Sequence, residues 1–380
     1  MPTPIVNIED LRQLARGYLP KAIFEFVDGG ATDEVTLRAN REDFSRHRFI
    51  PRVNTDVSQR SLATTILGQP ASLPIVIAPT GLAGLVRRKG ECLEAQVATR
   101  LGIPYCQSQM SASSIEDISA AAPGAHWLQV YLLKERDINR RIMQRARAAG
   151  YRTLVLTVDT KTQGPRERDM RNGFVIPPRI TLRNLADAVR CWRWTLDVPL
   201  GPTVTFANLA GETHSKSDLF TIAEYIRDLY DLSFGWEALE WCKSEWQGPV
   251  AVKGILSPED AKLAVQHGAD AVIVSNHGGR QLDSAISAIA ALPAVVDAVG
   301  GRAEVILDGG VRRGIDVVKA LCLGARACMV GRPFLYGLAV QGEAGVEKVA
   351  EMFRREIDSA MLLLGQSSLG GLVPGLLARP

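Results

Sequence analysis

The 380-residue sequence lacks the patterns that mark several protein classes. Its six cysteines form no C-x-x-C pair and show no zinc-ligand spacing, so we expect buried, reduced thiols and no metal site. No uncharged apolar run is long enough to span a membrane, and the first residues lack the basic and apolar regions of a signal peptide. These absences predict a cytoplasmic protein.

Further absences narrow the choice of ligand. The formal net charge of +3 is close to balance, which predicts no nucleic-acid partner. There is no Walker A sequence, so a nucleoside triphosphate held by a P-loop is not expected. With 46% hydrophobic and 22% charged residues, the chain nevertheless has the composition of a protein with a large buried core.

The most regular feature that is present is an alternation of strand-like and helical patterns from about residue 72 onward. Short apolar runs that predict buried strands occupy residues 73–78, 104–107, 127–132, 153–158, 250–252, 271–274, 304–307 and 327–330. Helical patterns lie between most of them, for example at 135–149, 258–267, 312–323 and 343–364. These β-α units predict a single α/β domain over residues 1–380, a closed (β/α)8 TIM barrel. An open doubly wound sheet is the alternative, and the missing G-x-G-x-x-G after the first strand weakens it.

Two segments do not follow this alternation. Residues 1–70 predict a helical cap in front of the barrel, in which Asn7 begins a helix in an approximate capping box with Asp10. Residues 160–235 predict a long insertion after the fourth strand, because they show no clear period. Within it, Cys191-Trp192-Arg193-Trp194 favours contact with a membrane surface through residues 185–215, with a surface insertion or subunit contact as the alternative.

Polar side chains follow nearly every predicted strand. The active-site residues of a barrel come from the carboxyl ends of its strands, and an inert barrel would carry such groups only occasionally. In chain order these ends carry Pro79, Thr80 and Gly81, then Ser108, Gln129 and Tyr131, Thr157, Asp159 and Arg166, Lys253, Ser275, His277 and Arg280, Asp308, and finally Gly331 and Arg332. The pattern predicts an enzyme with its active site at this end of the barrel.

Two of these strand ends favour an anionic ligand. Asp308-Gly309-Gly310-Val311-Arg312 leads into a helix after the seventh strand, and Gly331-Arg332-Pro333 follows the eighth. Free backbone N–H groups at a helix start, together with arginines, form a site for the phosphate that barrels often bind there. We therefore expect a phosphate-bearing cofactor or substrate, although Arg312 taken alone also fits a solvated surface.

The segment from Ser275 to Asp283, with the sequence SNHGGRQLD, carries the clearest chemical signal. His277 is a proton acceptor suited to neutral pH, and Arg280 can hold a carboxylate through two parallel hydrogen bonds. The segment resembles the active-site signature of the FMN-dependent L-2-hydroxy-acid oxidases and dehydrogenases. That family includes glycolate oxidase, bacterial L-lactate dehydrogenase, mandelate dehydrogenase and the flavin domain of flavocytochrome b2. The resemblance extends over nearly the whole chain.

The resemblance implies that the protein uses FMN to oxidise an L-2-hydroxy acid to the 2-oxo acid. It implies that His277 is the base with Asp159 as its carboxylate partner, and that Tyr131, Arg166 and Arg280 bind the substrate. The implied FMN contacts are Pro79, Thr80, Gly81, Ser108, Gln129, Thr157, Lys253, Ser275, Asp308, Gly309, Gly310, Arg312, Gly331 and Arg332. The choice between hydride and carbanion transfer stays open.

Three departures from the family pattern bear on the substrate and on the electron acceptor. Phe26 stands where the family has a tyrosine that touches the substrate carboxylate, and Met110 where glycolate oxidase has a tryptophan over the substrate. Gly81 stands where the oxidases usually have alanine. These departures imply a lactate- or mandelate-like substrate, longer or aromatic, and an acceptor such as a quinone. An oxygen-using oxidase is the alternative.

Family analogy also implies a homo-oligomer, most often a tetramer, and links the insertion of the bacterial lactate and mandelate dehydrogenases to membrane attachment. That link implies a peripheral position on the inner face of the cell membrane. Two other functions fit the residues themselves. One is a barrel enzyme that binds a phosphorylated substrate without flavin, and the other is a non-catalytic scaffold.

Overall fold

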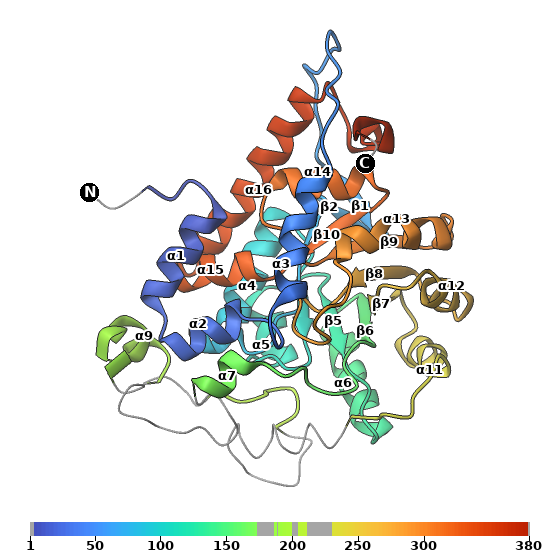
Figure 1. Ribbon diagram of the computed structural model, residues 1–380. Helices are drawn as coiled ribbons and strands as arrows, with labels where there is room; N and C mark the ends of the chain where they lie inside the picture. Colours follow the sequence, from blue (N-terminus) through green and yellow to red (C-terminus); the bar gives the residue numbers. More distant parts are fainter. Residues whose placement is uncertain (1–3, 173–185, 188, 200–203, 211–229, 379–380) are drawn as a thin grey trace.

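The computed structural model describes residues 4–172, 186–187, 189–199, 204–210 and 230–378. At the centre of this part of the chain lie eight parallel strands (Figure 1): β3 (Ile75–Ile77), β4 (Cys106–Ser108), β5 (Trp127–Val130), β6 (Thr153–Thr157), β7 (Val250–Ile255), β8 (Ala271–Ser275), β9 (Glu304–Asp308) and β10 (Ala327–Val330). Each strand from β4 to β9 pairs with the next strand in the chain, and β10 pairs with β3. A parallel bridge between Ile77 and Tyr105 joins β3 to the start of β4. The ring closes, which confirms the predicted barrel over the open sheet.

Helices cover the outside of the barrel (Figure 1). They are α4 (Gly90–Leu101), α5 (Ile115–Ala121), α6 (Arg136–Ala148), α11 (Glu237–Trp246), α12 (Pro258–Gln266), α13 (Ala288–Val299), α14 (Gly314–Cys322), α15 (Arg332–Gln341) and α16 (Glu343–Leu363). The side chains of Ser114, Ser257 and Ser287 accept backbone N–H groups at the starts of α5, α12 and α13. The sequence pattern places α6, α12, α14 and α16 to within two residues of these bounds.

Alternate side chains along each strand point into the barrel and change from apolar to polar toward its carboxyl end. On β5 the buried Trp127 is followed two residues later by Gln129, and on β6 Val155 is followed by Thr157. The same change occurs on β7, β8 and β9, from Ala251 to Lys253, from Ile273 to Ser275 and from Ile306 to Asp308. The apolar members fill the interior, so the polar members gather at one end of a packed core.

The N-terminal helices are α1 (Ile8–Tyr18), α2 (Lys21–Asp28), α3 (Val35–Glu42) and the 3-10 helix η1 (Asp43–Arg46). Of these helices, α2 and α3 lie against this polar end, and α1 packs on the outer helix α15. The Asn7 side chain accepts the backbone N–H of Asp10 and the Asp10 carboxylate accepts that of Asn7, which confirms the predicted capping box. The backbone N–H of Ala31, between α2 and α3, donates to the carbonyl of Gly279 in the SNHGGRQLD segment.

The last part of the segment predicted as a helical cap is not helical. Residues 64–71 form a hairpin of β1 (Thr64–Ile66) and β2 (Gln69–Ala71), and its Ile66 and Leu67 side chains belong to the barrel interior. Gln69 hydrogen-bonds Trp127 and Thr153 at the starts of β5 and β6, so the hairpin plugs the amino-terminal end of the barrel. Each strand has three residues, which is too few for a periodic signal in the sequence.

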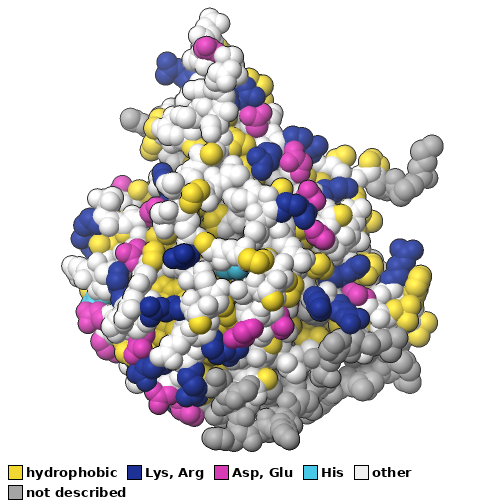
Figure 2. All heavy atoms as spheres, turned by 180° about the vertical axis from the view of Figure 1, so that it is seen from behind, with side chains coloured by type: hydrophobic (Ala, Val, Ile, Leu, Met, Phe, Trp, Pro, Cys, Tyr) yellow, Lys and Arg dark blue, Asp and Glu magenta, His cyan; other side chains and the backbone are white. Residues whose placement is uncertain are grey.

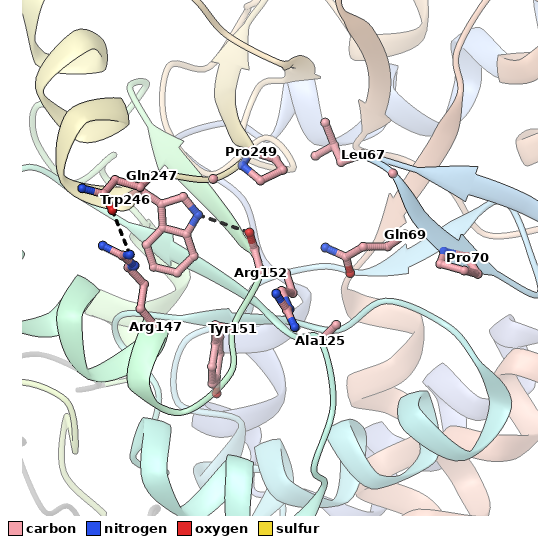
Figure 3. A pocket seen from close by; sticks show the side chains of 12 residues that line it. Leu67, Gln69, Pro70, Ala125, Arg147, Tyr151, Arg152, Trp246, Gln247 and Pro249 are labelled. Atoms are coloured by element: carbon pink, nitrogen blue, oxygen red, sulfur yellow. Dashed lines mark hydrogen bonds between the residues drawn. The ribbon is translucent and has the colours of Figure 1, made fainter.

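A cavity of about 610 Å³ lies beside this hairpin (Figure 3). Arg147, Tyr151, Arg152 and Trp246 line it, and the figure shows Trp246 donating to the backbone of Arg152. None of the site residues predicted from the sequence lines this cavity. It lies at the end of the barrel opposite to the polar strand ends.

The structure describes only part of the predicted insertion at residues 160–235. The described part contains α7 (Glu167–Arg171) and α9 (Trp192–Asp197). Trp194 donates from Nε1 to the Leu85 carbonyl at 2.8 Å, so one side of α9 packs on the barrel. The side chains of Val189, Trp192 and Leu196 are exposed. Within the described ranges, no helix has the length and apolar character needed to cross a membrane.

Candidate active site

The carboxyl ends of the barrel strands form an opening that we call the mouth of the barrel. Three polar side chains form a row there along β4, β5 and β6. Ser108 lies opposite Gln129 in the register of β4 and β5, and its hydroxyl donates to Gln129 Oε1 at 3.1 Å. Gln129 Nε2 then donates to Thr157 Oγ1 at 3.0 Å. All three side chains are buried, so the row is fixed before any ligand binds.

Lys253, Ser275 and Asp308 continue this rim. Thr157 lies opposite Lys253 in the register of β6 and β7, and Ser275 lies opposite Asp308 in that of β8 and β9. Lys253 Nζ lies 3.0 Å from Ser275 Oγ and 3.0 Å from Asp308 Oδ2. Burial acts to lower the pKa of Lys253, but the Asp308 and Asp159 carboxylates outweigh it and raise the pKa. The buried amine therefore stays charged.

His277 and Asp159 form a hydrogen-bonded pair in the same mouth. His277 Nδ1 lies 2.9 Å from Asp159 Oδ1, which leaves Nε2 as the nitrogen available to a ligand. Burial lowers the pKa of His277 below its ordinary value of 6.5; Asp159 opposes this shift and Lys253 adds to it. For Asp159, burial acts to raise the pKa, but His277 and Lys253 outweigh it and lower the pKa. At neutral pH the pair is therefore a neutral imidazole beside a carboxylate.

Two backbone conformations produce this pairing. His277 has a φ of 58°, in the left-handed region, immediately after β8 ends. Gly254 has a φ of 110° where the register of β7 and β8 shifts, and a Cβ added there would lie 2.6 Å from the Cβ of Asp159. Only glycine lets Asp159 pack this closely against β7. Gly254 could not be predicted as a site residue from the sequence, because a glycine in a strand does not indicate which residue packs against it.

The other polar members of the SNHGGRQLD segment brace it rather than face the mouth. Asn276 exchanges two side-chain hydrogen bonds, of 2.7 and 2.8 Å, with Asn40 of α3. Asp283 accepts three backbone N–H groups at the start of α3, and Gln281 Nε2 donates to the carbonyl of Asp159 at 3.1 Å. Asn40 was also missed from the sequence, because its partner lies 236 residues away.

Arg280 and Arg332 meet the carboxyl end of α2. Arg280 Nη1 donates to the carbonyls of Phe26 at 2.7 Å and Gly29 at 3.0 Å, and Arg332 donates to those of Val27 at 2.9 Å and Gly29 at 2.8 Å. The partial negative charge at a helix carboxyl end favours cations there. Phe26 lacks a hydroxyl, and its ring centroid lies 5.2 Å from the guanidinium carbon of Arg280.

The arginines of the mouth are buried, and Arg166 and Arg312 are short of hydrogen-bond acceptors. Burial lowers the pKa of Arg280 well below its usual range, and the neighbouring Arg166 and Arg332 lower it further. Burial also lowers the pKa of Arg166 and Arg312. The Nε atoms of Arg166 and Arg312 are buried, with no hydrogen-bond partner in the described part of the chain. An anionic ligand would supply the missing acceptors and the missing negative charge.

Small residues close the remaining side of the mouth, between β10 and β3. Thr80 and Gly81 follow Pro79 after β3, and Gly331 follows β10, which pairs with β3. A Cβ added to Gly331 would lie 3.3 Å from Thr80 Cγ2, and one added to Gly81 would lie 3.3 Å from the Cβ of Met110. This wall, the polar row and the arginines together fit a flat, phosphate-bearing cofactor such as FMN.

Gly309 and Gly310 follow β9 with φ angles of 127° and 79°. A Cβ on Gly310 would lie 1.8 Å from the backbone oxygen of Asn40, so the approach of α3 requires glycine here. Its predicted contact with the cofactor stays a prediction.

Tyr131 and a second tyrosine lie side by side in the mouth. The Tyr131 ring stacks near His277 at 6.5 Å between centroids, and Tyr230 meets it edge to face at 5.5 Å. A bridge between Leu133 and Tyr230 fixes the backbone there. Burial raises the pKa of both phenols, so both are neutral donors. Tyr230 was missed because it follows a stretch of the insertion with no periodic pattern.

Comparison with known proteins identifies the family of the chain. Residues 15–379 match the family described as FMN-dependent dehydrogenase. The chain is 43% identical over 368 residues to an L-lactate oxidase from Nostoc sp., covering 96% of this chain and 95% of the relative. It is 40% identical over 376 residues to an L-lactate dehydrogenase from Caulobacter vibrioides, covering 99% and 98%. The crystal structure of the monotopic membrane protein (S)-mandelate dehydrogenase matches with a TM-score of 0.96, at 40% identity and over 100% of both chains. The chain therefore belongs to the FMN-dependent dehydrogenase family.

Proposed function

We propose that this protein, an FMN-dependent enzyme that oxidises an L-2-hydroxy acid to the 2-oxo acid, is a dehydrogenase with His277 as its base. The observation that carries the proposal is the meeting of four groups at one end of the barrel. They are the imidazole of His277 with its carboxylate partner, the buried ammonium of Lys253, and the guanidiniums of Arg166 and Arg280. Together they provide a proton acceptor beside sites for a carboxylate.

His277 takes a proton from the substrate. Because Nδ1 is hydrogen-bonded to Asp159, Nε2 receives the proton, either from the hydroxyl group or from the α-carbon of the substrate. The carboxylate of Asp159 then stabilises the imidazolium that forms. Bound FMN supplies the acceptor for the two electrons that leave the substrate.

Arg166 and Arg280 bind the substrate carboxylate, and Tyr131 donates a hydrogen bond beside the reacting carbon. The carboxylate would give Arg166 Nε the acceptor that it lacks and would offset the mutual repulsion of the two guanidiniums. Tyr131 suits this role because it is neutral and stacked near His277. A substrate held in this way presents one face to the imidazole, which favours one enantiomer.

The residues that would hold FMN fall into groups by chemistry. The row of Ser108, Gln129 and Thr157 offers polar contacts to the ring, and Lys253 offers a positive charge. Pro79, Thr80 and Gly81 form the wall on the other side. The remaining proposed contacts, to the ribityl chain and phosphate, are Ser275, Asp308, Gly309, Gly310, Arg312, Gly331 and Arg332.

Two residues beside the proposed FMN site bear on the electron acceptor and on the class of substrate. Gly81 and Met110 leave an adaptable pocket, which we assign to a longer or aromatic 2-hydroxy acid with an acceptor other than oxygen. The relatives named above include both an oxidase and a dehydrogenase at similar identity, so their names do not decide. Purified protein supplied with L-lactate or L-mandelate should reduce an artificial dye much faster than it consumes oxygen. Equal rates of dye reduction and oxygen consumption would make the protein an oxidase instead.

We also propose that α9 touches a membrane surface. Trp192 and Leu196 lie four residues apart on one face of α9, and both are 56% exposed. The guanidinium of Arg193 lies 5.3 Å from the centroid of a Trp192 ring, so a cation borders the apolar side chains. In Figure 2, yellow and dark blue side chains lie next to one another at the edge of the molecule where α9 lies.

Replacing Trp192 and Leu196 together by glutamate should weaken binding to vesicles of phosphatidylethanolamine and phosphatidylglycerol at least about tenfold, because each apolar side chain contributes roughly 1.5–3 kcal/mol when buried. Co-flotation with the vesicles measures this. Val53→Glu changes another exposed apolar side chain, far from α9 in the chain, and should leave binding unaltered. If the double variant floats as well as the unchanged protein, α9 is not the contact.

A further inference from the structure

Thr160 follows Asp159 in the loop after β6, and its hydroxyl lies within the His277–Asp159 pair. Its Oγ1 lies 3.0 Å from Asp159 Oδ1 and 3.4 Å from His277 Nδ1. The same hydroxyl interacts with that of Tyr131. One small side chain therefore contacts all three groups that surround the proposed proton transfer, and Thr160 was not among the site residues predicted from the sequence.

The contacts of Asp159 make this hydroxyl important. Asp159 Oδ1 accepts from both His277 Nδ1 and Thr160 Oγ1, whereas Asp159 Oδ2 is buried with no hydrogen-bond partner in the ranges that the structure describes. Among the described residues, side-chain donors thus contact only one oxygen of Asp159, and Thr160 supplies one of these two donors. A carboxylate that is shared with a second donor attracts an imidazolium less strongly than one that is not.

We propose that Thr160 is a positioning residue whose hydroxyl, shared between Asp159 and His277, sets how readily His277 takes up a proton. The inference rests on the proposed function for its link to catalysis. The geometry itself concerns only residues of this chain. By donating a hydrogen bond to Asp159, the hydroxyl weakens the attraction of that carboxylate for a proton on His277 and adds to the effect of burial, which favours an uncharged imidazole ready to act as a base.

Charged groups from several other elements also face His277, and each of them raises or lowers its pKa. Lys253 of β7 and Arg166 of the loop before α7 favour the neutral imidazole, and Asp159 favours the charged one. The guanidinium of Arg332 borders the adjacent Gly278, where an added Cβ would lie 2.7 Å from its Nη1. None of these groups is changed by replacing Thr160, so we assign a change in titration to the loss of the hydroxyl.

Thr160→Val removes the hydroxyl and keeps the shape of the side chain. We expect the pKa of His277 in the FMN-loaded protein to rise by roughly 0.5 to 1 pH unit. NMR of histidine-labelled protein measures this directly, because the chain has five histidines and the His277→Asn spectrum assigns the signal. Since the base must be neutral, kcat/KM should fall on the acidic side, with a midpoint below pH 6.5 in the unchanged protein. In Thr160→Val this midpoint should move to higher pH by the same amount as the pKa of His277.

Thr160→Ser keeps the hydroxyl and should restore both the titration and the pH profile. Thr160→Ala lacks the hydroxyl and should behave as Thr160→Val, so it carries the test if the valine variant does not take up FMN. If both variants without the hydroxyl titrate like the unchanged protein, or if serine fails to restore the titration, the proposal is wrong. The NMR titration needs no turnover. Absence of any oxidation by the unchanged protein would therefore overturn the proposed function without deciding the role of Thr160.

Discussion

Replacing His277 by Asn should slow the oxidation of the 2-hydroxy acid by about 10²- to 10⁴-fold, the usual contribution of a positioned acid or base. Asparagine suits this test because it tolerates the left-handed backbone that His277 adopts, with a φ of 58°, and so should not disturb the loop. It offers no group that takes up a proton at neutral pH. FMN content should stay unchanged, because His277 is proposed to contact the substrate and not to hold the cofactor.

The measurement is the rate of FMN reduction after mixing with substrate in the absence of oxygen, with FMN content checked by absorbance. His267→Asn is the matched control. His267 is hydrogen-bonded to Glu240, lies outside the mouth of the barrel and takes no part in the site. A His277→Asn variant that reduces FMN at a rate close to that of the unchanged protein would show that another group is the base.

Replacing Lys253 by Met should have the second large effect, on both stability and turnover. Lys253 is 4% exposed and lies 3.0 Å from Asp308, whose side chain is 13% exposed, so replacing Lys253 leaves a largely buried carboxylate without its cation. Breaking a buried pair in this way costs about 3–5 kcal/mol of the free energy of unfolding. Turnover should also fall, because the buried positive charge that we propose to lie beside the FMN ring is lost. Urea unfolding and steady-state rates measure the two effects separately.

A second substitution separates the structural from the catalytic part of this effect. In Lys253→Met combined with Asp308→Asn, no unpaired carboxylate remains at position 308, so much of the lost stability should return. Turnover should stay low, since the ammonium is still absent. If turnover returns together with stability, Lys253 acts only by holding the barrel rim together.

Much of this site could be predicted from the sequence because barrel strands alternate regularly. Gln129 follows Trp127 by two residues and Lys253 follows Ala251 by two, so each polar residue shares the inward face with an apolar one. A barrel brings all such strand ends together, whatever their separation in the chain. The pairing of His277 with Asp159 could be predicted only through the family resemblance, and the structure gives it a distance of 2.9 Å.

The residues that the sequence did not reveal depend on contacts between distant segments. Asn40 matters because α3 packs on the SNHGGRQLD segment, and Gly254 because a shift in register makes room for Asp159. Thr160 and Tyr230 lie in connections, where no periodic pattern says which way a side chain points. The hairpin at 64–71 was missed for a related reason, since three-residue strands carry too little periodicity.

We propose that one end of this barrel holds FMN next to a base and two arginines that bind an L-2-hydroxy acid. The most direct measurement mixes the purified protein, without oxygen, with a panel of 2-hydroxy acids from glycolate to L- and D-mandelate. We predict that the protein purifies yellow and that L-acids remove the absorbance of oxidised FMN while their D-enantiomers do so far more slowly. A colourless protein that takes up no FMN, or a yellow protein that no 2-hydroxy acid bleaches, would contradict the account.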